Sequence, residues 1–419
     1  DMAGATAAFL CGSLWSLLCL GSDSADAALS GRSDGPMTRI TADWLNSDAA
    51  RTVCGVLTGA GYQAWYVGGC VRNALLGAPV ADLDLSTDAL PDDVMRLAGA
   101  AGLRAIPTGI AHGTVTIVSG NTPFEVTTFR KDIDTDGRRA TVAFADNITD
   151  DAHRRDFTMN ALYADPDGIV ADPLGGLVDL NARQVRFIDD PEARIKEDYL
   201  RILRFFRFHA WYGDPNGGLD ADGLAACAAN TDGLGQLSRE RVGSEMRKLL
   251  CAPDPAPAVA VMETAGVLMR VLPGASGASL AVLVHIEGEV GLAPDPIRRL
   301  ALIGGEDVAM RLRLAKREAA DLAVLRDGLG NGLPAEVLGY RHGGQALDVL
   351  ALRAAMGGLE LDPNLVAHAR FGAEQVLPVS ARDFMPDLQG AALGKAVKDA
   401  EERWIASGFT LTRDTLLRG

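Results

Sequence analysis

The chain has 419 residues and 48% hydrophobic content, which is too much for one ordinary core and enough for roughly two to four domains. Its formal net charge of −15 argues against a protein that coats nucleic acid without regard to sequence, so any RNA contact must be concentrated where arginine and lysine cluster. The six cysteines form no CxxC pair, which argues against structural zinc and indicates buried thiols in a reducing compartment.

The N-terminal segment differs from the rest of the chain. Residues 2–20 are apolar, but no lysine or arginine precedes them, as a secretion signal requires. Residues 21–36 are rich in Ser, Asp, Gly and Ala, and Met37 begins a stretch typical of an ordinary start. We therefore expect residues 1–36 to be a disordered or misassigned leader and the protein to be cytoplasmic. An export signal is the alternative.

Residues 37–185 have the alternating character of one mixed α/β domain. Helices are expected at 43–61, 72–76 and 91–99, and strands at 64–67, 83–85, 114–118 and 124–129. The segment Ser-Gly-Asn-Thr at 119–122 predicts a hairpin turn between the last two strands. Residues 131–140 are polar and contain glycine, so we expect a mobile loop there.

From about residue 195 the pattern is helical to the end of the chain. Breaks are expected at segments that contain proline, namely 215–218, 253–257, 273–277 and 294–296. The predicted fold class is therefore α+β, with an α/β head followed by an elongated all-helical part.

A pair of aspartates in the segment 81–85, Ala-Asp-Leu-Asp-Leu, is the sharpest local feature. Side chains two apart in a strand share a face, so Asp82 and Asp84 project together. Adjacent carboxylates repel unless a cation bridges them, and Mg²⁺ in phosphoryl transfer is the natural occupant. Glu125 would join them if its strand paired antiparallel with theirs. A solvated strand end is the alternative for the pair alone.

The turn before this pair contains Gly68 and Gly69, between an expected strand and an expected helix. Glycines let the backbone approach a ligand and present N–H groups to it, and Arg72 can reach a phosphate one helical turn later. We therefore predict a triphosphate site, with a plain tight turn as the alternative. No GK[ST] or GxGxxG follows, which excludes a P-loop and a dinucleotide fingerprint.

A second unusual pattern occupies residues 197–208, where every third residue from Asp198 to Arg207 is charged and nearly all others are apolar. Positions three apart are neighbours on a helix, so one helix would carry a charged row along a partly buried, wet groove. A solvated helix face is the alternative, but it leaves the apolar residues on the other sides unexplained.

Over residues 62–250 the chain resembles the class II tRNA nucleotidyltransferases, which are CCA-adding enzymes, and the bacterial poly(A) polymerases. The stretches that carry the resemblance are VGGCVRNALLG (67–77), ADLDLST (81–87), HGTVTIV (112–118), FEVTTFR (124–130), RRDFTMNAL (154–162), DPLGGLVDL (172–180) and EDYLRILRFFRF (197–208). The resemblance implies a DNA polymerase beta-like nucleotidyltransferase head at 37–185. It also implies a helical neck at 186–255 that selects the nucleotide and binds RNA, and a helical body and tail at 256–419 that bind tRNA.

The resemblance also implies roles for single residues. Asp82 and Asp84 would bind Mg²⁺, with Glu125 as the third catalytic acid. The implied nucleotide-binding residues are Gly68, Gly69, Arg72, Arg155, Asp198, Arg201, Arg204 and Arg207, with Arg154, Asp156 and Asn160 as supports. One departure is Asn73, where the family usually carries Asp, so that a local salt bridge is expected to be lost.

In this family the residues that match Asp198 and Arg201 act as a protein template. Cytosine and adenine both present an amine donor beside a ring-nitrogen acceptor, so Asp can accept from the amine while Arg donates to the ring. Guanine and uracil present the reverse pattern, and the resulting unpaired groups give discrimination of roughly 10⁴ or more.

We therefore expect an RNA 3′-terminal nucleotidyltransferase that adds C, C and A to the tRNA 3′ end from CTP and ATP and releases pyrophosphate. We expect neither a membrane nor an obligate protein partner. The alternatives are a bacterial poly(A) polymerase, an enzyme that adds only CC or only A, and a non-catalytic RNA-binding relative. Further candidates for phosphate contacts are basic residues at 239, 241, 247–248, 298–299, 311, 313 and 316–317, each with a solvated surface as its alternative.

Overall fold

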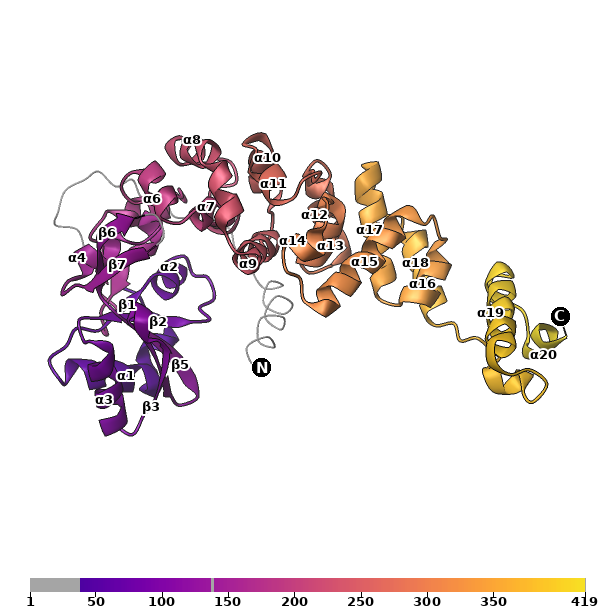
Figure 1. Ribbon diagram of the computed structural model, residues 1–419, viewed down its shortest axis with the longest axis horizontal. Helices are drawn as coiled ribbons and strands as arrows, with labels where there is room; N and C mark the ends of the chain where they lie inside the picture. The colour runs from indigo at the N-terminus through magenta and orange to yellow at the C-terminus, as the bar shows by residue number, and fades with distance from the viewer. Residues whose placement is uncertain (1–37, 137–138, 419) are drawn as a thin grey trace. The chain divides into compact units, whose positions relative to one another are not determined.

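The computed structural model describes residues 38–136 and 139–418 (Figure 1). These residues form two compact units that divide between Pro273 and Gly274. The leader expected at 1–36 lies outside the described residues. No helix within the described ranges is both long and apolar enough to cross a membrane.

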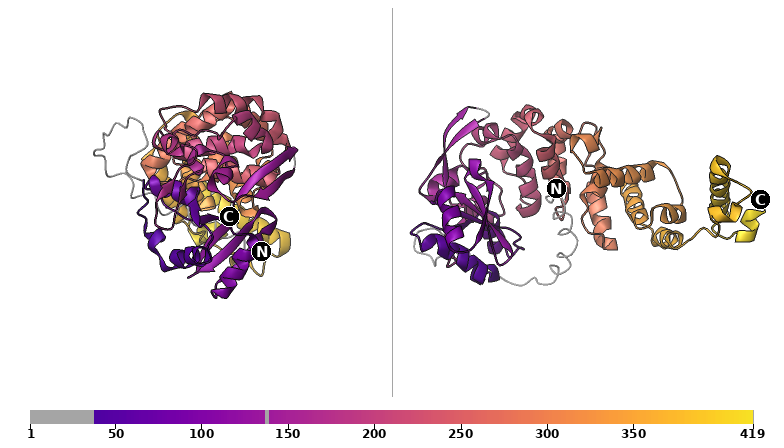
Figure 2. Two further views of the ribbon diagram at one scale, coloured as in Figure 1. Left: turned by 90° about the vertical axis from the view of Figure 1, so that its left-hand side faces the viewer. Right: turned by 60° about the horizontal axis from the view of Figure 1, so that its bottom comes forward.

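The first unit contains a seven-stranded sheet with strand order β3-β4-β5-β2-β1-β8-β9. Its strands are β1 (Trp65–Val67), β2 (Leu83–Thr87), β3 (Arg104–Gly109), β4 (Thr114–Ser119), β5 (Thr122–Thr128), β8 (Tyr163–Ala164) and β9 (Val170–Ala171). All neighbours pair antiparallel except β2 and β5, which are parallel. Helices α1 (Asp48–Thr58) and α3 (Pro91–Ala100) pack on the half of the sheet that contains β3, β4 and β5 (Figure 2).

The predicted hairpin between β4 and β5 is confirmed. The two strands pair antiparallel across Gly120 and Asn121, whose φ angles are 55° and 66°. A two-residue type I′ turn needs positive φ at both positions, and Gly and Asn tolerate it best. The strands β3, β8 and β9 were not expected. The last two are too short to show a period, and β3 is an edge strand that contains Pro107.

The described part of the segment 131–140 forms strands instead of the expected loop, and residues 137–138 lie outside the described residues. Strands β6 (Arg130–Asp136) and β7 (Arg139–Phe144) form a separate two-stranded antiparallel sheet, with Arg130 opposite Phe144. A two-stranded ribbon has no need for a continuous apolar face, because backbone hydrogen bonds hold its strands together. The alternation that indicates a strand in a sequence is therefore weak here.

The first unit also contains further helices. They are α2 (Gly69–Leu75), α4 (Ile148–His153), α5 (Gly176–Asn181), α6 (Pro191–Glu197), α7 (Leu200–Tyr212), α8 (Ala221–Ala229), α9 (Arg239–Leu250), α10 (Ala256–Thr264) and α11 (Val267–Val271). Short 3₁₀ segments include η3 (Thr158–Asn160) and η4 (Thr231–Gln236). Helices α7 and α9 pack together.

The single helix expected across 197–208 is wrong at its start. Helix α6 ends at Glu197, and Asp198 is extended, with φ −153° and ψ 103°. The Asp198 Oδ1 atom accepts a hydrogen bond from the Leu200 N–H at 3.1 Å, at the start of α7. An aspartate that binds the first free N–H groups of a helix stabilises a new helix start, and this competes with continuation of the previous helix.

The second unit is all helical, as predicted. Its helices are α12 (Leu280–Val290), α13 (Pro296–Ile303), α14 (Val308–Arg311), α15 (Lys316–Gly330), α16 (Ala335–His342), α17 (Gln345–Gly357), α18 (Pro363–Ala373), α19 (Gly390–Ala406) and α20 (Arg413–Leu417). With the mixed sheet of the first unit, these helices confirm the α+β fold class.

A buried ion-pair cluster lies in this second unit. Arg298 donates from Nε to Glu287 Oε1 at 2.8 Å and from Nη1 to Asp348 Oδ1 at 2.6 Å. Arg299 donates from Nη2 to Glu287 Oε2 at 2.6 Å, and both arginines are at most 3% exposed. The expectation that residues 298–299 contact phosphates is therefore wrong. Glu287, on the preceding helix, and Asp348, on α17, balance these charges in the core.

Candidate active site

The glycine turn joins β1 to α2. Gly68 has φ 69° and ψ −119°, a conformation that side chains with a Cβ rarely adopt, and α2 begins at the next residue, Gly69. A Cβ on Gly68 would lie 3.4 Å from the Arg155 guanidinium. The helix begins three residues earlier than the sequence indicated, so Arg72 lies within its first turn. The turn therefore brings backbone N–H groups and Arg72 to the same place.

Arg72 is buried, with 5% exposure, among neutral partners. Its Nη1 donates to Asn160 Oδ1, and its Nη2 donates to Asn73 Oδ1 at 2.9 Å and to the Tyr212 hydroxyl at 2.8 Å. The guanidinium also lies 3.9 Å from the centre of the Tyr212 ring and 5.1 Å from that of Phe208. Burial lowers the Arg72 pKa. With no carboxylate among these partners, the charge of Arg72 is available to an anion.

Asn73 keeps a structural role at the position where the sequence departs from the family pattern. Its Oδ1 accepts from both Nε and Nη2 of Arg72, at 3.1 and 2.9 Å. Its Nδ2 donates to the Pro79 carbonyl at 2.8 Å. An amide therefore orients Arg72 here without neutralising it.

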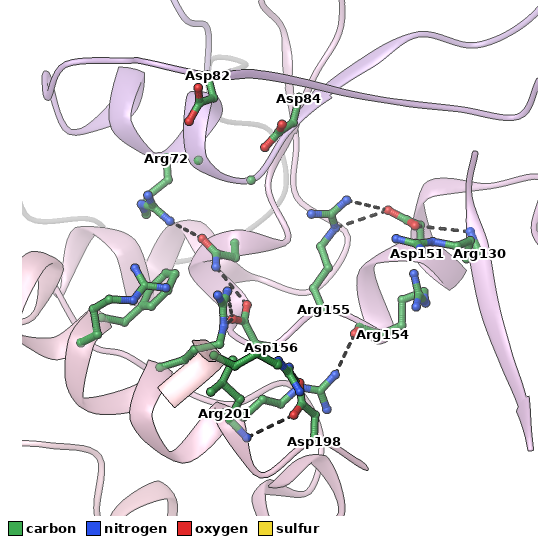
Figure 3. Close-up of a pocket in the computed structure, with 18 residues that line it drawn as sticks. Arg72, Asp82, Asp84, Arg130, Asp151, Arg154, Arg155, Asp156, Asp198 and Arg201 are labelled. Atoms are coloured by element: carbon green, nitrogen blue, oxygen red, sulfur yellow. Dashed lines mark hydrogen bonds and ion pairs between the residues drawn. The ribbon is translucent and has the colours of Figure 1, made fainter. Parts of the chain in front are cut away.

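The two aspartates line a cavity beside the sheet. Asp82 is exposed just before β2, Asp84 is half-buried within it, and their carboxylates point the same way (Figure 3). Burial raises the pKa of Asp84 to about 6, with repulsion from Glu125 and Asp82 adding to the rise and Arg155 opposing it. Negative charge is therefore concentrated here, and a cation would relieve it.

Glu125 reaches this region by a different pairing from the one expected. It lies opposite Asp84, but in a parallel pair of β2 with β5. The expected antiparallel arrangement is wrong, because the chain passes through the antiparallel strands β3 and β4 before β5, and β5 then runs parallel to β2. Glu125 is exposed and does not line the cavity. Within the described ranges, no group of three or more acidic, histidine or cysteine side chains is close enough to hold a metal ion by itself.

Arg155 is fixed behind the aspartates. Its Nη2 donates to Asp151 Oδ2 at 2.9 Å and to the Ser86 hydroxyl at 3.3 Å, and its Nε donates to the Tyr163 hydroxyl at 3.1 Å. Burial opposes the charge on Arg155, but Asp151 and then Tyr163 outweigh burial and raise its pKa. Arg155 therefore stays cationic with its direction set.

Asp156, which lies just after α4, forms an ion pair with Arg204 of α7. Its Oδ2 accepts from Nε and Nη2 of Arg204 at 2.8 and 2.5 Å, and its Oδ1 accepts from Asn160 Nδ2 at 2.9 Å. Burial opposes its ionisation, yet Arg204 and Asn160 lower its pKa to about 2. Because Asn160 also accepts from Arg72, these four side chains form one continuous network.

The charged row lies on the cavity side of α7. Arg201, Arg204 and Arg207 are half-buried, and fully buried pairs of apolar residues separate them. Arg207 Nε donates to Glu245 Oε2 at 2.5 Å, and the guanidinium lies 4.5 Å from the centre of the Phe208 ring. Within α7, the predicted partly buried groove is therefore confirmed.

The candidate base-selecting pair is anchored from two directions. Arg201 Nη1 donates to Glu197 Oε2 at 2.5 Å and to the Arg194 carbonyl at 2.7 Å. Asp198 Oδ2 accepts from Arg241 Nη2 at 2.6 Å. Both members of the pair line the cavity and have free hydrogen-bonding capacity toward it.

All these groups surround one cavity of about 620 Å³. Eight arginines and five aspartates line it, a local basic excess in a chain whose net charge is −15. Every residue predicted for the site lies on it except Glu125. The sequence did not point to Arg130, Asp151 or Phe208 as site residues and indicated Arg241 only as a phosphate contact, although Asp151 and Arg155 had the i, i+4 spacing of a helical ion pair. The lining residues are Gly68, Gly69, Arg72, Asp82, Asp84, Arg130, Asp151, Arg154, Arg155, Asp156, Asn160, Asp198, Leu200, Arg201, Arg204, Arg207, Phe208 and Arg241.

Gly233 in η4 packs against the break between α6 and α7. A Cβ there would lie 1.9 Å from the Tyr199 ring, so Gly233→Ala should force this ring to move and destabilise the protein by ~1–3 kcal/mol. Gly235→Ala is the matched control, because a Cβ at Gly235 meets nothing within 4 Å. Urea unfolding of both variants tests this, and equal midpoints would contradict it.

Comparison with known proteins agrees with this geometry. The family described as "Poly A polymerase head domain" matches residues 64–186, and "Probable RNA and SrmB-binding site of polymerase A" matches residues 219–278. The mitochondrial CCA tRNA nucleotidyltransferase 1 of Mus musculus is 32% identical over 372 residues, which cover 84% of each chain. The chain belongs to the CCA tRNA nucleotidyltransferase family. This confirms the family and the enzyme class, an RNA nucleotidyltransferase, that the motifs indicated.

Other members of the family are similar over different lengths. The CCA-adding enzyme of Geobacillus thermodenitrificans is 41% identical over 216 residues, so this chain spans about half (52%) of that relative's length. The structure of the Bacillus stearothermophilus CCA-adding enzyme in complex with CTP is 29% identical, with a TM-score of 0.70 over 86% of this chain and 92% of that one. The Thermotoga maritima enzyme complexed with tRNA is 17% identical, with a TM-score of 0.62, and supports the fold alone.

Proposed function

We propose that this family member adds C, C and A to the 3′ end of tRNA, using CTP and ATP and releasing pyrophosphate. The observation that carries the proposal is the single cavity that joins the aspartate pair, the glycine turn and the Asp198–Arg201 pair. The relatives include an enzyme whose structure holds CTP and one complexed with tRNA. The cytoplasmic location stays a prediction.

Triphosphate binding falls to the glycine turn and the arginines around it. The Gly68 N–H already donates to the Leu162 carbonyl at 3.2 Å, so the groups that suit an anion are the backbone N–H of Gly69 and the guanidinium of Arg72, which hydrogen-bonds neutral partners. Arg155 is held in place by its ion pair with Asp151, so it contributes fixed N–H donors more than net charge. Arg204 and Arg207 already have carboxylate partners, so they contribute direction more than net charge.

Asp82 and Asp84 are the proposed Mg²⁺ ligands. Mg²⁺ is commonly bound through one or two carboxylates and completed by substrate phosphates and water, so two acids and a triphosphate suffice. The elevated pKa of Asp84 fits such a site, since burial, and then repulsion from Glu125 and Asp82, make its charge unfavourable without a bound cation. A Mg²⁺ ion bound to Asp82 and Asp84 would stabilise the negative charge that develops on the transferring phosphate and would favour loss of the proton from the attacking 3′-hydroxyl. Glu125 is proposed to add negative potential from the neighbouring strand.

Base choice is proposed to rest on Asp198 as acceptor and Arg201 as donor. Asp198→Ala should lower the ratio of kcat/KM for CTP over UTP roughly 10- to 100-fold, because a hydrogen bond to a charged group is lost. The ratio is measured with each nucleotide alone on tRNA that lacks its CCA end. Lys196→Ala, on the exposed part of α6, is the control. Unchanged nucleotide preference in Asp198→Ala would contradict the proposal that Asp198 selects the base.

The rest of the chain is proposed to hold the RNA. We propose a head at 37–185, a neck at 186–255, and a body and tail at 256–419. Basic residues that remain exposed and suit phosphate contacts are Arg239, Lys248, Arg313, Lys316 and Arg317. The poly(A) polymerase and the CC-only or A-only enzymes remain the competing functions, since they share the head motifs.

A further inference from the structure

Asp198 is held by two donors from different parts of the chain. Its Oδ1 accepts from the Leu200 N–H at 3.1 Å, and its Oδ2 accepts from Arg241 Nη2 at 2.6 Å. Arg241 lies in the first turn of α9 and lines the same cavity as Asp198. The second rotatable bond of an aspartate side chain has broad preferences, so these two contacts fix the plane of the carboxylate.

We propose that Arg241 is a positioning residue for base selection, which orients Asp198 toward the amine of cytosine or adenine. Each carboxylate oxygen has two acceptor sites. With one site on each oxygen used by Leu200 and Arg241, one site per oxygen is left for the base. Arg241 therefore orients the acceptor, Asp198, as Glu197 orients the donor, Arg201. This proposal rests on the base-selecting role proposed above for Asp198.

The position of α9 does not depend on the ion pair. Ser238 caps the helix by accepting from the Arg241 N–H at 3.4 Å, and Val242 and Met246 are buried on the same helix. Helix α9 packs along α7, and Gly233, just before it, contacts the Tyr199 ring. The packing of α9 thus fixes the backbone of Arg241, and this backbone position places the guanidinium beside Asp198.

The pair itself contributes little to folding. The side chains of Arg241 and Asp198 are 49% and 33% exposed, and ion pairs at such sites stabilise proteins only slightly. Loss of Arg241 should therefore change base preference while leaving thermal stability nearly unchanged. A merely structural arginine would show the opposite behaviour.

The test uses the full-length protein and tRNA that lacks its CCA end. Arg241→Ala should lower the ratio of kcat/KM for CTP over UTP about tenfold, and Arg241→Lys should recover part of it. Arg51→Ala, at an exposed arginine on α1, should leave the ratio unchanged. Thermal unfolding is measured for each variant. If Arg241→Ala is unfolded at the assay temperature, Arg241→Gln, which keeps most of the side chain, takes its place.

A double-mutant cycle separates this inference from the proposed function. In an Asp198→Ala background, Arg241→Ala should lower the ratio no further, because it acts through Asp198. An unchanged ratio in Arg241→Ala, or an equal loss in both backgrounds, would overturn the positioning role and leave Asp198 as the selector. An unchanged ratio in Asp198→Ala would instead overturn the base-selecting role of Asp198, and the role of Arg241 with it.

Discussion

Asp84→Asn is expected to lower kcat for nucleotide addition by roughly a hundred- to a thousandfold, because a proposed metal ligand is lost and such a ligand supports several kcal/mol of transition-state stabilisation. The amide has nearly the same shape as the carboxylate, so the packing of β2 is kept. Single-turnover extension of a tRNA primer, at saturating nucleotide and Mg²⁺, measures the loss.

The same substitution should raise thermal stability in EDTA at pH 8. The pKa of Asp84 is raised in the folded state to about 6, so the ionised carboxylate destabilises the fold above this pH, and the cost disappears as the pH falls below it. Asn carries no charge and avoids the cost. Asp92→Asn, exposed on α3, is the control and should change neither property. Full activity in Asp84→Asn would remove it from the catalytic site, and a lower Tm would contradict the electrostatic argument.

Glu287→Ala is expected to destabilise the second unit by ~3–5 kcal/mol, the largest effect on stability that we predict. Glu287 is 3% exposed and is the carboxylate that both Arg298 and Arg299 contact. Its removal takes from these two buried arginines the carboxylate that they share. Urea unfolding of the full chain and hydrogen exchange in α13 measure the effect.

A matched control lies on the same helix. Glu289 is 47% exposed and contacts His285 at 3.3 Å, so Glu289→Ala should cost at most ~1 kcal/mol. Equal effects of the two substitutions would show that the buried cluster does not stabilise this unit. Unchanged exchange in α13 of Glu287→Ala would lead to the same conclusion.

The sequence indicated the site well where chemistry and local spacing coincide. The aspartate pair depends only on the two-residue period of a strand, and the glycine turn only on backbone freedom. Both features are present in the structure, and both line the same cavity. The charged row in α7 was equally visible, because buried apolar pairs alternate with single arginines. These patterns need no knowledge of distant contacts.

Features set by long-range contacts could not be predicted in this way. Asp198 interrupts the helix because its side chain binds Leu200 and Arg241, and the second of these is 43 residues away. The direction of β5 relative to β2 is set by the path of the chain through β3 and β4, which pair antiparallel in turn, and not by either strand's own sequence. Arg298 and Arg299 looked like surface residues because their partners are separated from them in sequence.

The sequence of the product made from tRNA that lacks its CCA end tests CCA addition directly. With both CTP and ATP supplied, we expect addition of C, C and A followed by a stop. A run of added A residues, or a product that ends at CC, would contradict CCA addition. So would the absence of any product, if tRNA that already ends in CC still receives a single A.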